Sequence, residues 1–395
     1  MNLLSNIAKN YPASGIRKMF DLAQKYDDVI KLTVGEPNFD TPVNVKEAAK
    51  KAIDEGHTHY APNAGLPELR EAIAKEYTKY SKDYTLDNVM ITVGGMEAIT
   101  MCLIATVNPG DEVIIPDPGF SNYVGQVMLA GAVPVSVPVF EENEFNIKAE
   151  DIEKAITSKT KAILLNSPSN PLGSVICKEE ILKIAQIVKK HNLIVYSDEV
   201  YDKLIFDGIE YFSIAQVPEV KDQVLVINSF SKAYAMTGWR IGYIIGNKDI
   251  ISVMPKLQEG IVSCVSTFTQ KAALEAYTGS QEAVEQMHAD YLRRRDILID
   301  GLNNIPGITC KKSPGSFYAF ANIKALGVSS EQFAIDLVKN TRVVVVPGSA
   351  FGSMGEGYFR SVFANSDENL IEAVRRIDEY VRKAYKQSSW NQMEF

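Results

Sequence analysis

Positions 229–240 carry the stretch Ser229-Phe230-Ser231-Lys232-Ala233-Tyr234-Ala235-Met236-Thr237-Gly238-Trp239-Arg240, directly after the apolar run 224–228 that predicts a buried strand. An ammonium group is costly to desolvate, so a lysine in such a place has a lowered pKa and can condense with a carbonyl as a Schiff base. Ser229, Ser231 and Arg240 add donors of the kind that bind a phosphate. The stretch points to pyridoxal 5′-phosphate (PLP), a carbonyl cofactor that carries a phosphate. The alternative is that Lys232 and Arg240 are solvated loop charges.

The length, net charge and cysteines of the chain limit the classes of protein to which it can belong. A chain of 395 residues is long enough for two domains, and its net charge of −8 argues against a nucleic-acid or anionic-membrane surface. We see no signal peptide and no run of membrane-spanning length. We expect a cytoplasmic protein with reduced thiols, because the cysteines lie far apart without paired spacing: Cys102, Cys177, Cys264 and Cys310.

Short apolar runs alternate with amphipathic segments through most of the chain. Such alternation predicts an α/β fold, with a mostly parallel, seven-stranded sheet covered by helices on both faces. Ligands of these sheets bind at the carboxyl ends of the strands. The predicted strands are 88–93, 111–115, 132–137, 161–165, 193–196, 224–228 and 241–245, and the predicted helices include 43–54, 66–80 and 179–191.

Polar residues follow three further strands at their carboxyl ends. Gly94-Gly95 opens a helix whose N–H groups suit a phosphate, although a glycine pair also serves packing alone. The loop 166–173 holds side-chain amides between prolines, which keep it rigid. Asp198 ends a buried strand and needs a positive partner, for which a pyridinium nitrogen would serve. A helix N-cap is the alternative role for this aspartate.

After about residue 281 the strands become sparser, which predicts a smaller α+β domain joined by the first forty residues. We place the large domain at 45–285 and the small domain at 1–44 and 286–395, with a polar tail, 386–395, that is expected to fray. The run Arg293-Arg294-Arg295 is interpreted as a solvated helix face. Arg360 differs because it lies inside an apolar strand, 358–364. If buried, it needs a carboxylate partner, from the protein or from a substrate.

Taken together, these motifs resemble the PLP-dependent aminotransferases of fold type I, class I and II, over nearly the whole chain. The match rests on their order as well as on their residues. In sequence order they are Gly35-Glu36-Pro37, Tyr60 with 61–65, Gly94-Gly95, Pro118-Gly119-Phe120 with Tyr123, 166–173, 198–201, 229–240 and Arg360.

The resemblance implies a role for each cofactor-binding residue. Lys232 would hold PLP and later move the substrate proton, and Asp198 would pair with the pyridinium nitrogen. Phe120 would stack on the ring, while Tyr201 and Asn170 would hydrogen-bond its phenolic oxygen. The phosphate ligands would be the Gly95 and Met96 amides, Ser229, Ser231 and Arg240.

The resemblance also implies how substrate and partner meet the site. Arg360 would clamp the substrate α-carboxylate, with Asn170 and the Gly35 backbone beside it. Tyr60 would reach the phosphate of the neighbouring subunit, so a homodimer with shared active sites is expected. Closure of the smaller domain would exclude water before proton transfer.

The implied reaction is transamination between an L-amino acid and a 2-oxo acid such as 2-oxoglutarate, by a ping-pong mechanism through pyridoxamine phosphate. Some aspartate-specific relatives carry a lysine where this chain has Met96. Met96, Phe120, Ile16 and Tyr123 suit an apolar or aromatic substrate, whereas Arg17 could meet a second carboxylate. Aspartate, aromatic and broad-range donors therefore stay open.

Three other functions are alternatives to transamination. A carbon–sulfur β-lyase on the same fold would share the core residues, and sequence alone does not separate it from an aminotransferase. A regulator without catalysis would normally carry an appended DNA-binding segment, and the intact Lys232 and Asp198 speak against it. A nicotinamide-dependent enzyme would need the dinucleotide glycine fingerprint, which does not open this chain.

Overall fold

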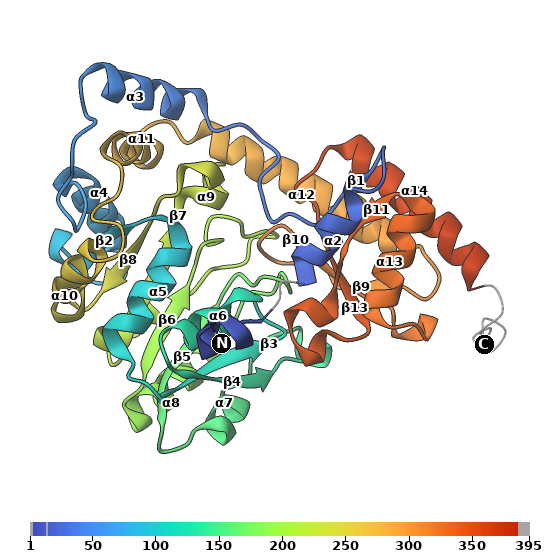
Figure 1. The fold of residues 1–395 in the computed structure, drawn as a ribbon, viewed down its shortest axis with the longest axis horizontal. Coiled ribbons are helices and arrows are strands. Elements are labelled where there is room, and N and C mark those ends of the chain that lie inside the picture. The colour runs from blue at the N-terminus through green and yellow to red at the C-terminus, as the bar shows by residue number, and fades with distance from the viewer. Residues whose placement is uncertain (1–2, 13–14, 386–395) are drawn as a thin grey trace.

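A seven-stranded sheet forms the centre of the larger part of the molecule in the computed structural model, which describes residues 3–12 and 15–385 (Figure 1). Only β8 runs antiparallel to its neighbours β2 and β7, and the other pairs are parallel. The predicted, mostly parallel seven-stranded sheet is confirmed. In spatial order its strands are β2 (Val89–Thr92), β8 (Gly242–Gly246), β7 (Val224–Ser229), β6 (Ile194–Asp198), β5 (Thr160–Asn166), β3 (Glu112–Asp117) and β4 (Val133–Pro138).

Both faces of this sheet are buried, which explains why its strands read as continuous apolar runs. In β7, Leu225 and Ile227 pack toward α5 (Gly94–Thr106), α6 (Asn122–Leu129) and α10 (Lys248–Glu259). Val224 and Val226, which alternate with them, belong to the core on the other face. That core includes residues of α4 (Pro67–Tyr77), α8 (Lys178–His191) and α11 (Thr267–Thr278).

A second, antiparallel sheet forms the centre of the smaller part, beside the large sheet in Figure 1. Its strand order is β12 (Val346–Pro347), β13 (Tyr358–Val362), β10 (Tyr318–Asn322) and β9 (Thr309–Cys310). The helices α12 (Glu282–Asn303), α13 (Ser330–Thr341) and α14 (Asp367–Ala384) pack around it. The division of the chain at residues 45 and 285 stays a prediction.

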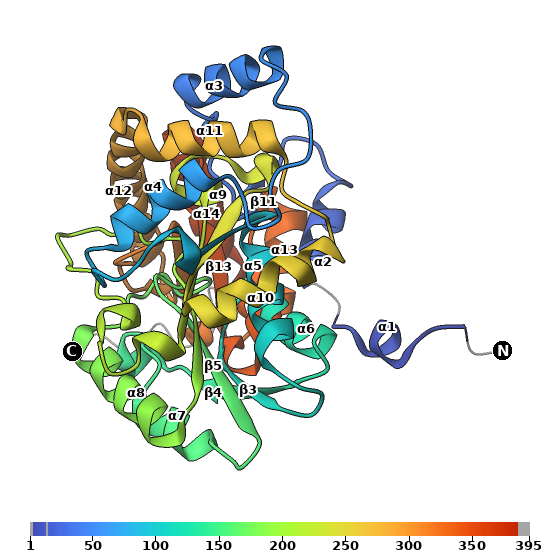
Figure 2. The ribbon, with the colours of Figure 1, turned by 90° about the vertical axis from the view of Figure 1, so that its left-hand side faces the viewer.

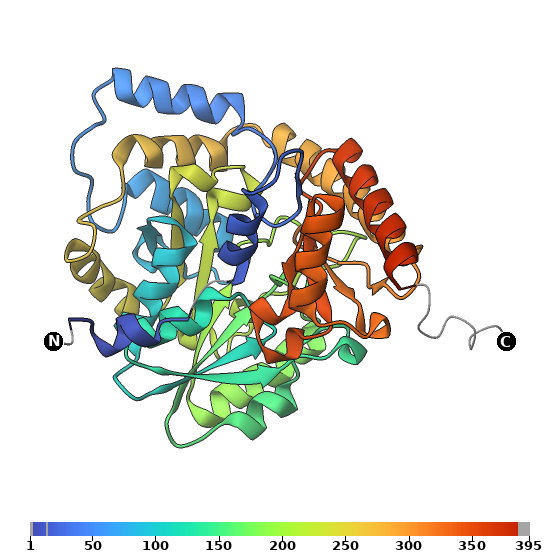
Figure 3. The ribbon, with the colours of Figure 1, turned by 45° about the vertical axis from the view of Figure 1, so that its right-hand side comes forward.

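The N-terminal segment joins this smaller part. Strand β1 (Ile30–Lys31) pairs in parallel with β11 (Val343–Val344), far away in the sequence. Figure 3 shows the blue N-terminal segment, including α2 (Gly15–Ala23), against the orange and red C-terminal elements. The apolar stretch after α13 forms two short strands rather than one, because β11 pairs with β1 while β12 pairs with β13.

The interpretation of the arginine run as a solvated helix face was wrong for two of its three members. Arg295 is only 2% exposed and binds the carboxylates of Asp207 and Asp296. Arg294 is also buried and donates to Asp367 at 3.1 Å. The run lies on α12, which packs against α14, and nearby carboxylates supply the partners that buried guanidinium groups need.

The carboxylate of Asp117 links the larger part of the molecule to the smaller part by hydrogen bonds. Asp117, at the end of β3, accepts hydrogen bonds from the N–H of Ser353 (3.2 Å), the hydroxyl of Ser353 (2.8 Å) and the N–H of Met354 (3.1 Å). Two residues on, the N–H of Gly119 donates to the carbonyl of Phe351 at 2.9 Å. Phe120 therefore sits on a loop that is tied to the smaller part.

The remaining elements connect these layers. Helix α1 (Asn6–Asn10) buries none of its residues and stands off from the body in Figure 2. Within residues 3–12 and 15–385, no helix combines the length and the apolar character needed to cross a membrane. The predicted fraying of 386–395 lies outside the described residues. Also present are α3 (Val43–Asp54), α7 (Ala149–Ala155), α9 (Phe230–Ala233) and short 3-10 turns, among them η7 (Gly348–Phe351) and η8 (Ser353–Gly355).

Candidate active site

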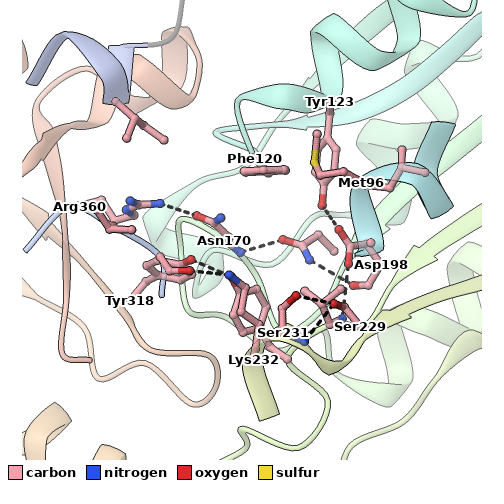
Figure 4. Close-up of a pocket in the computed structure, with 18 of the residues that line it drawn as sticks. Met96, Phe120, Tyr123, Asn170, Asp198, Ser229, Ser231, Lys232, Tyr318 and Arg360 are labelled. Atoms are coloured by element: carbon pink, nitrogen blue, oxygen red, sulfur yellow. Dashed lines mark hydrogen bonds between the residues drawn. The ribbon is translucent and has the colours of Figure 1, made fainter. Parts of the chain in front are cut away.

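A cavity of ≈ 310 Å³ lies at the carboxyl ends of the large sheet's strands and is closed on one side by residues of the smaller part (Figure 4). Arg360 and Asp198 lie at opposite ends of this cavity, with Phe120 and Lys232 on opposite sides between them. Of the predicted site residues, the lining includes Gly35, Gly95, Met96, Phe120, Asn170, Asp198, Tyr201, Ser229, Ser231, Lys232, Arg240 and Arg360.

Hydrogen-bond donors gather at one end of the cavity. Helix α5 begins at Gly94, and the first N–H groups of a helix have no intrahelical acceptor, so those of Gly95 and Met96 are open to an anion. Ser229 and Ser231, whose hydroxyl oxygens lie 2.8 Å apart, face the same end. A Cβ on Gly94, which has φ +74°, would lie 2.6 Å from a guanidinium nitrogen of Arg240. The positive φ favours glycine here, and the missing side chain leaves room for the guanidinium.

Lys232 lies on α9, the short helix that follows β7, and its amine donates to the carbonyl of Gly35. The pKa of this amine is lowered to about 8, chiefly by burial; the charge of Glu36 opposes the shift, and the guanidinium groups of Arg360 and Arg240 contribute to it. At pH 7 about a tenth of Lys232 is therefore the neutral amine, the form that acts as a base or a nucleophile, far more than for an ordinary lysine.

Asp198 ends β6 with its carboxylate buried. One oxygen accepts from the hydroxyl of Tyr123 at 2.6 Å, and the other accepts a long bond from the N–H of Val200 at 3.4 Å. Burial raises the pKa of Asp198 to about 6, although both hydrogen bonds oppose the shift. Within the described residues the carboxylate forms no ion pair, and no helix begins after it that it could cap. A cationic ligand would balance this charge.

Arg360, on β13, is only 1% exposed, and all its protein partners are neutral. Its guanidinium donates to the side-chain oxygen of Asn170 at 2.9 Å and to the carbonyl of Thr33. Its Nε has no hydrogen-bond partner in the part of the chain that the structure describes. Burial lowers the pKa of the guanidinium, but an arginine remains charged in proteins. This buried cation lacks the carboxylate that a stable pair requires.

The donor and acceptor set of this cavity fits PLP. The α5 N-terminus, two serines and Arg240 match a phosphate, and the unpaired Asp198 carboxylate matches a pyridinium N–H. The Lys232 amine matches an aldehyde, and the flat ring of Phe120 matches the face of the cofactor ring. The hydroxyl of Tyr201 and the amide nitrogen of Asn170 can both donate to a phenolic oxygen.

Tyr60, which was predicted to reach the phosphate of a neighbouring subunit, does not line the cavity of its own chain. Its side chain is 89% exposed and lies outside the lining. The sequence also missed lining residues, among them Thr33 and Tyr318. Tyr318 stands between Phe317 and Ala319 in an apolar run, and only its phenolic hydroxyl distinguishes it from core residues there.

Comparisons with known proteins agree with this geometry. The family described as "Aminotransferase class I and II" matches residues 27–377. An aspartate aminotransferase of Pyrococcus horikoshii is 44% identical over 92% of this chain and 94% of its own. Aromatic-amino-acid aminotransferase 2 of Thermococcus litoralis is 42% identical over 94% and 96%. The crystal structure of an aromatic aminotransferase from Pyrococcus horikoshii covers 92% of this chain and 99% of its own, with 42% identity and a TM-score of 0.88.

The lowered pKa of Lys232 predicts a labelling profile for the cofactor-free protein. The yield of acetylated Lys232 should rise with pH through a midpoint near 8, against 10.5 for an ordinary lysine, because burial disfavours the ammonium form. Mass spectrometry of the peptide that contains Lys232 measures the yield. Asp198→Asn should move the midpoint lower, since it removes a charge that raises the pKa of Lys232. A midpoint above 10 in the parent protein would contradict the burial of the Lys232 amine in this cavity.

Proposed function

The chain belongs to the class I and II aminotransferase family and is a PLP-dependent aminotransferase, and we propose that it prefers aromatic or other apolar L-amino acids as donors and uses a 2-oxo acid such as 2-oxoglutarate as acceptor. Among the residues that the structure describes, nothing in the cavity favours the carbon–sulfur β-lyase alternative. The residue roles below belong to the same proposal.

One observation carries the assignment of the substrate-binding end: the buried guanidinium of Arg360 has neutral protein partners only. Every amino donor and every 2-oxo acceptor has a carboxylate beside the reacting carbon, and Arg360 offers it a fixed, charge-assisted site. Asn170 holds one guanidinium nitrogen at 2.9 Å and the Thr33 carbonyl holds the other, so the plane of the clamp is set before substrate arrives.

The opposite end of the cavity would hold the cofactor. Ser229, Ser231, Arg240 and the first N–H groups of α5 would bind its phosphate, and Asp198 would accept a hydrogen bond from its ring nitrogen. Tyr123 keeps the Asp198 carboxylate in place through its 2.6 Å hydrogen bond. PLP, when bound, supplies an electron-withdrawing ring that stabilises negative charge at the substrate Cα.

Lys232 would be the acid–base group of the reaction. Its amine lies in the same cavity as Arg360, and its pKa of about 8 leaves it able both to take and to return a proton near neutral pH. Once substrate occupies the site, the neutral Nζ would remove the proton from the substrate Cα. The guanidinium groups of Arg240 and of the buried Arg360 disfavour the protonated amine, which promotes return of the proton.

The donor preference rests on the walls of the cavity. The only side-chain cations in the described lining are Lys232, Arg240 and Arg360, each with a role already assigned, so none remains for a second carboxylate. Arg17, which the sequence left as a candidate for that role, is not part of the lining. The apolar side chains of the lining would accept an aromatic or aliphatic substrate: Ile16, Val34, Met96, Ile99, Phe120 and Val200.

The proposal includes a cytoplasmic homodimer. Tyr60 lies fully outside the cavity of its own chain, so its predicted contact with a phosphate requires a second copy. Large apolar side chains are exposed on the same molecule, among them Val43 and Ile261. Sedimentation of the PLP-loaded protein measures the assembly, and a fully active monomer would contradict this part of the proposal.

Arg360→Ala should lower kcat/KM for an amino acid donor by roughly 30- to 5,000-fold, because a buried, charged contact worth about 2–5 kcal/mol is lost. Steady-state kinetics measure the change. Arg293→Ala, which removes a half-exposed arginine of α12, should stay within about twofold of the parent chain. An Arg360→Ala variant with unchanged kcat/KM would show that the carboxylate binds elsewhere.

Met96→Lys should raise the ratio of kcat/KM for aspartate over phenylalanine by about tenfold or more, since it adds a cation to the apolar wall. Met96→Leu is the matched control and should leave this ratio within about twofold, because it keeps the wall apolar. The proposed donor class would be wrong if the parent chain already preferred aspartate to phenylalanine.

A further inference from the structure

Tyr318 is a buried residue of the cavity for which the reaction described above has no use. It lies on β10, opposite Val362 of β13, and is 1% exposed. In Figure 4 it stands at the end of the cavity where Arg360 lies, on the side toward Lys232. Its ring contacts the clamp arginine and its hydroxyl contacts Tyr201, so one side chain reaches groups assigned to the two different ligands.

The rings of Tyr318 and Phe351 both contact the guanidinium of Arg360. The guanidinium carbon lies 4.5 Å from the centroid of the Tyr318 ring and 4.7 Å from that of Phe351. Aromatic faces attract a cation without accepting its N–H bonds. The two rings therefore hold the guanidinium plane and leave its free Nε–H for a carboxylate.

The hydroxyl of Tyr318 lies 2.7 Å from that of Tyr201, and the described residues give neither hydroxyl another partner. The two phenol hydroxyls carry two protons, and their shared hydrogen bond uses one of them. The other proton can therefore be donated to a ligand. The backbone of Gly35 lies close to the Tyr318 hydroxyl, because a Cβ at this position would be only 2.1 Å from the hydroxyl oxygen. The absence of a side chain at Gly35 therefore makes room for this hydroxyl.

The nearby cation decides which phenol donates. Burial raises the pKa of both phenols and Arg360 opposes the shift at both, but its guanidinium lies directly against the Tyr318 ring, where it is the largest opposing cause, whereas the pKa of Tyr201 is raised well above its ordinary value. Tyr318 is therefore the stronger acid and the better donor. Its hydrogen bond to the Tyr201 oxygen polarises the remaining Tyr201 O–H, which strengthens that group as a donor.

We propose that Tyr318 is a positioning residue for both ligands: its ring orients Arg360 toward the substrate carboxylate, and its hydroxyl donates to Tyr201 and so directs the Tyr201 proton to the phenolic oxygen of PLP. This inference rests on the proposed function of the cavity. The inference goes beyond the proposed function because it links the substrate-binding and cofactor-binding halves of the site through one side chain.

The two parts of Tyr318 can be removed separately. Tyr318→Phe deletes the hydroxyl and keeps the ring against Arg360, while Tyr318→Leu deletes both. Tyr291→Phe is a matched control, because it removes a buried hydroxyl without a hydrogen-bond partner, on a ring 5.6 Å from that of Phe317. All three variants are compared with the parent chain, loaded with PLP.

Two readouts separate positioning from packing. The first is the pH midpoint of the visible absorption band of the bound cofactor, which reports donation to the phenolic oxygen. It should rise by about half a pH unit in Tyr318→Phe, because a weaker donor stabilises the phenolate less. The second is KM for the amino acid, which should change less than about twofold in Tyr318→Phe and rise about tenfold in Tyr318→Leu.

A Tyr318→Phe midpoint that falls, or that matches the parent chain and Tyr291→Phe, would overturn the proposal. An unchanged KM in a folded, PLP-loaded Tyr318→Leu would overturn its first half. If Tyr318→Leu fails to fold, the Tyr318→Phe midpoint still decides the second half. A parent chain that binds no PLP would instead overturn the proposed function itself, so the two failures are distinguishable.

Discussion

Charge buried without a protein counter-charge is the constraint on which the rest of this structure depends. Asp198 is a carboxylate without an ion pair in the described chain, and Arg360 is a guanidinium with neutral partners only. Lys232 lies between them with a pKa lowered by burial to about 8. Each group would be costly in a protein that bound nothing. Together they define a cavity that needs a cationic ring at one end and a carboxylate at the other.

The fold supplies this cavity from separate parts of the chain. Parallel strands bring Asp198, Ser229 and the α5 N-terminus to one edge of the large sheet, while β13 carries Arg360 from the smaller part. The contacts of Asp117 with Ser353 and Met354 fix the smaller part against the loop of Phe120. Aromatic rings then complete the clamp, so its geometry depends on packing across both sheets.

Much of this could be predicted from the sequence, because apolar runs ending in polar motifs are local features. The seven-stranded sheet follows from such runs, and Lys232, Asp198 and Arg360 lie in the cavity as expected. Features that depend on distant contacts were missed. Arg294 and Arg295 are buried and pair with carboxylates from other segments of the chain. Tyr318 lies against β13 and forms a hydrogen bond with Tyr201. Tyr60 is exposed in the single chain, so its predicted contact with the phosphate of a second subunit stays a prediction.

An absorbance spectrum of the PLP-loaded protein tests the central claim most directly. We expect a visible band that fades when phenylalanine is added and returns when 2-oxoglutarate follows, because the proposed Arg360 clamp and Lys232 base would serve both half-reactions. Lys232→Ala, the control, should show neither change. No band after incubation with PLP would contradict the assignment of the cavity. A band that persists with every amino acid tested would contradict the assigned reaction.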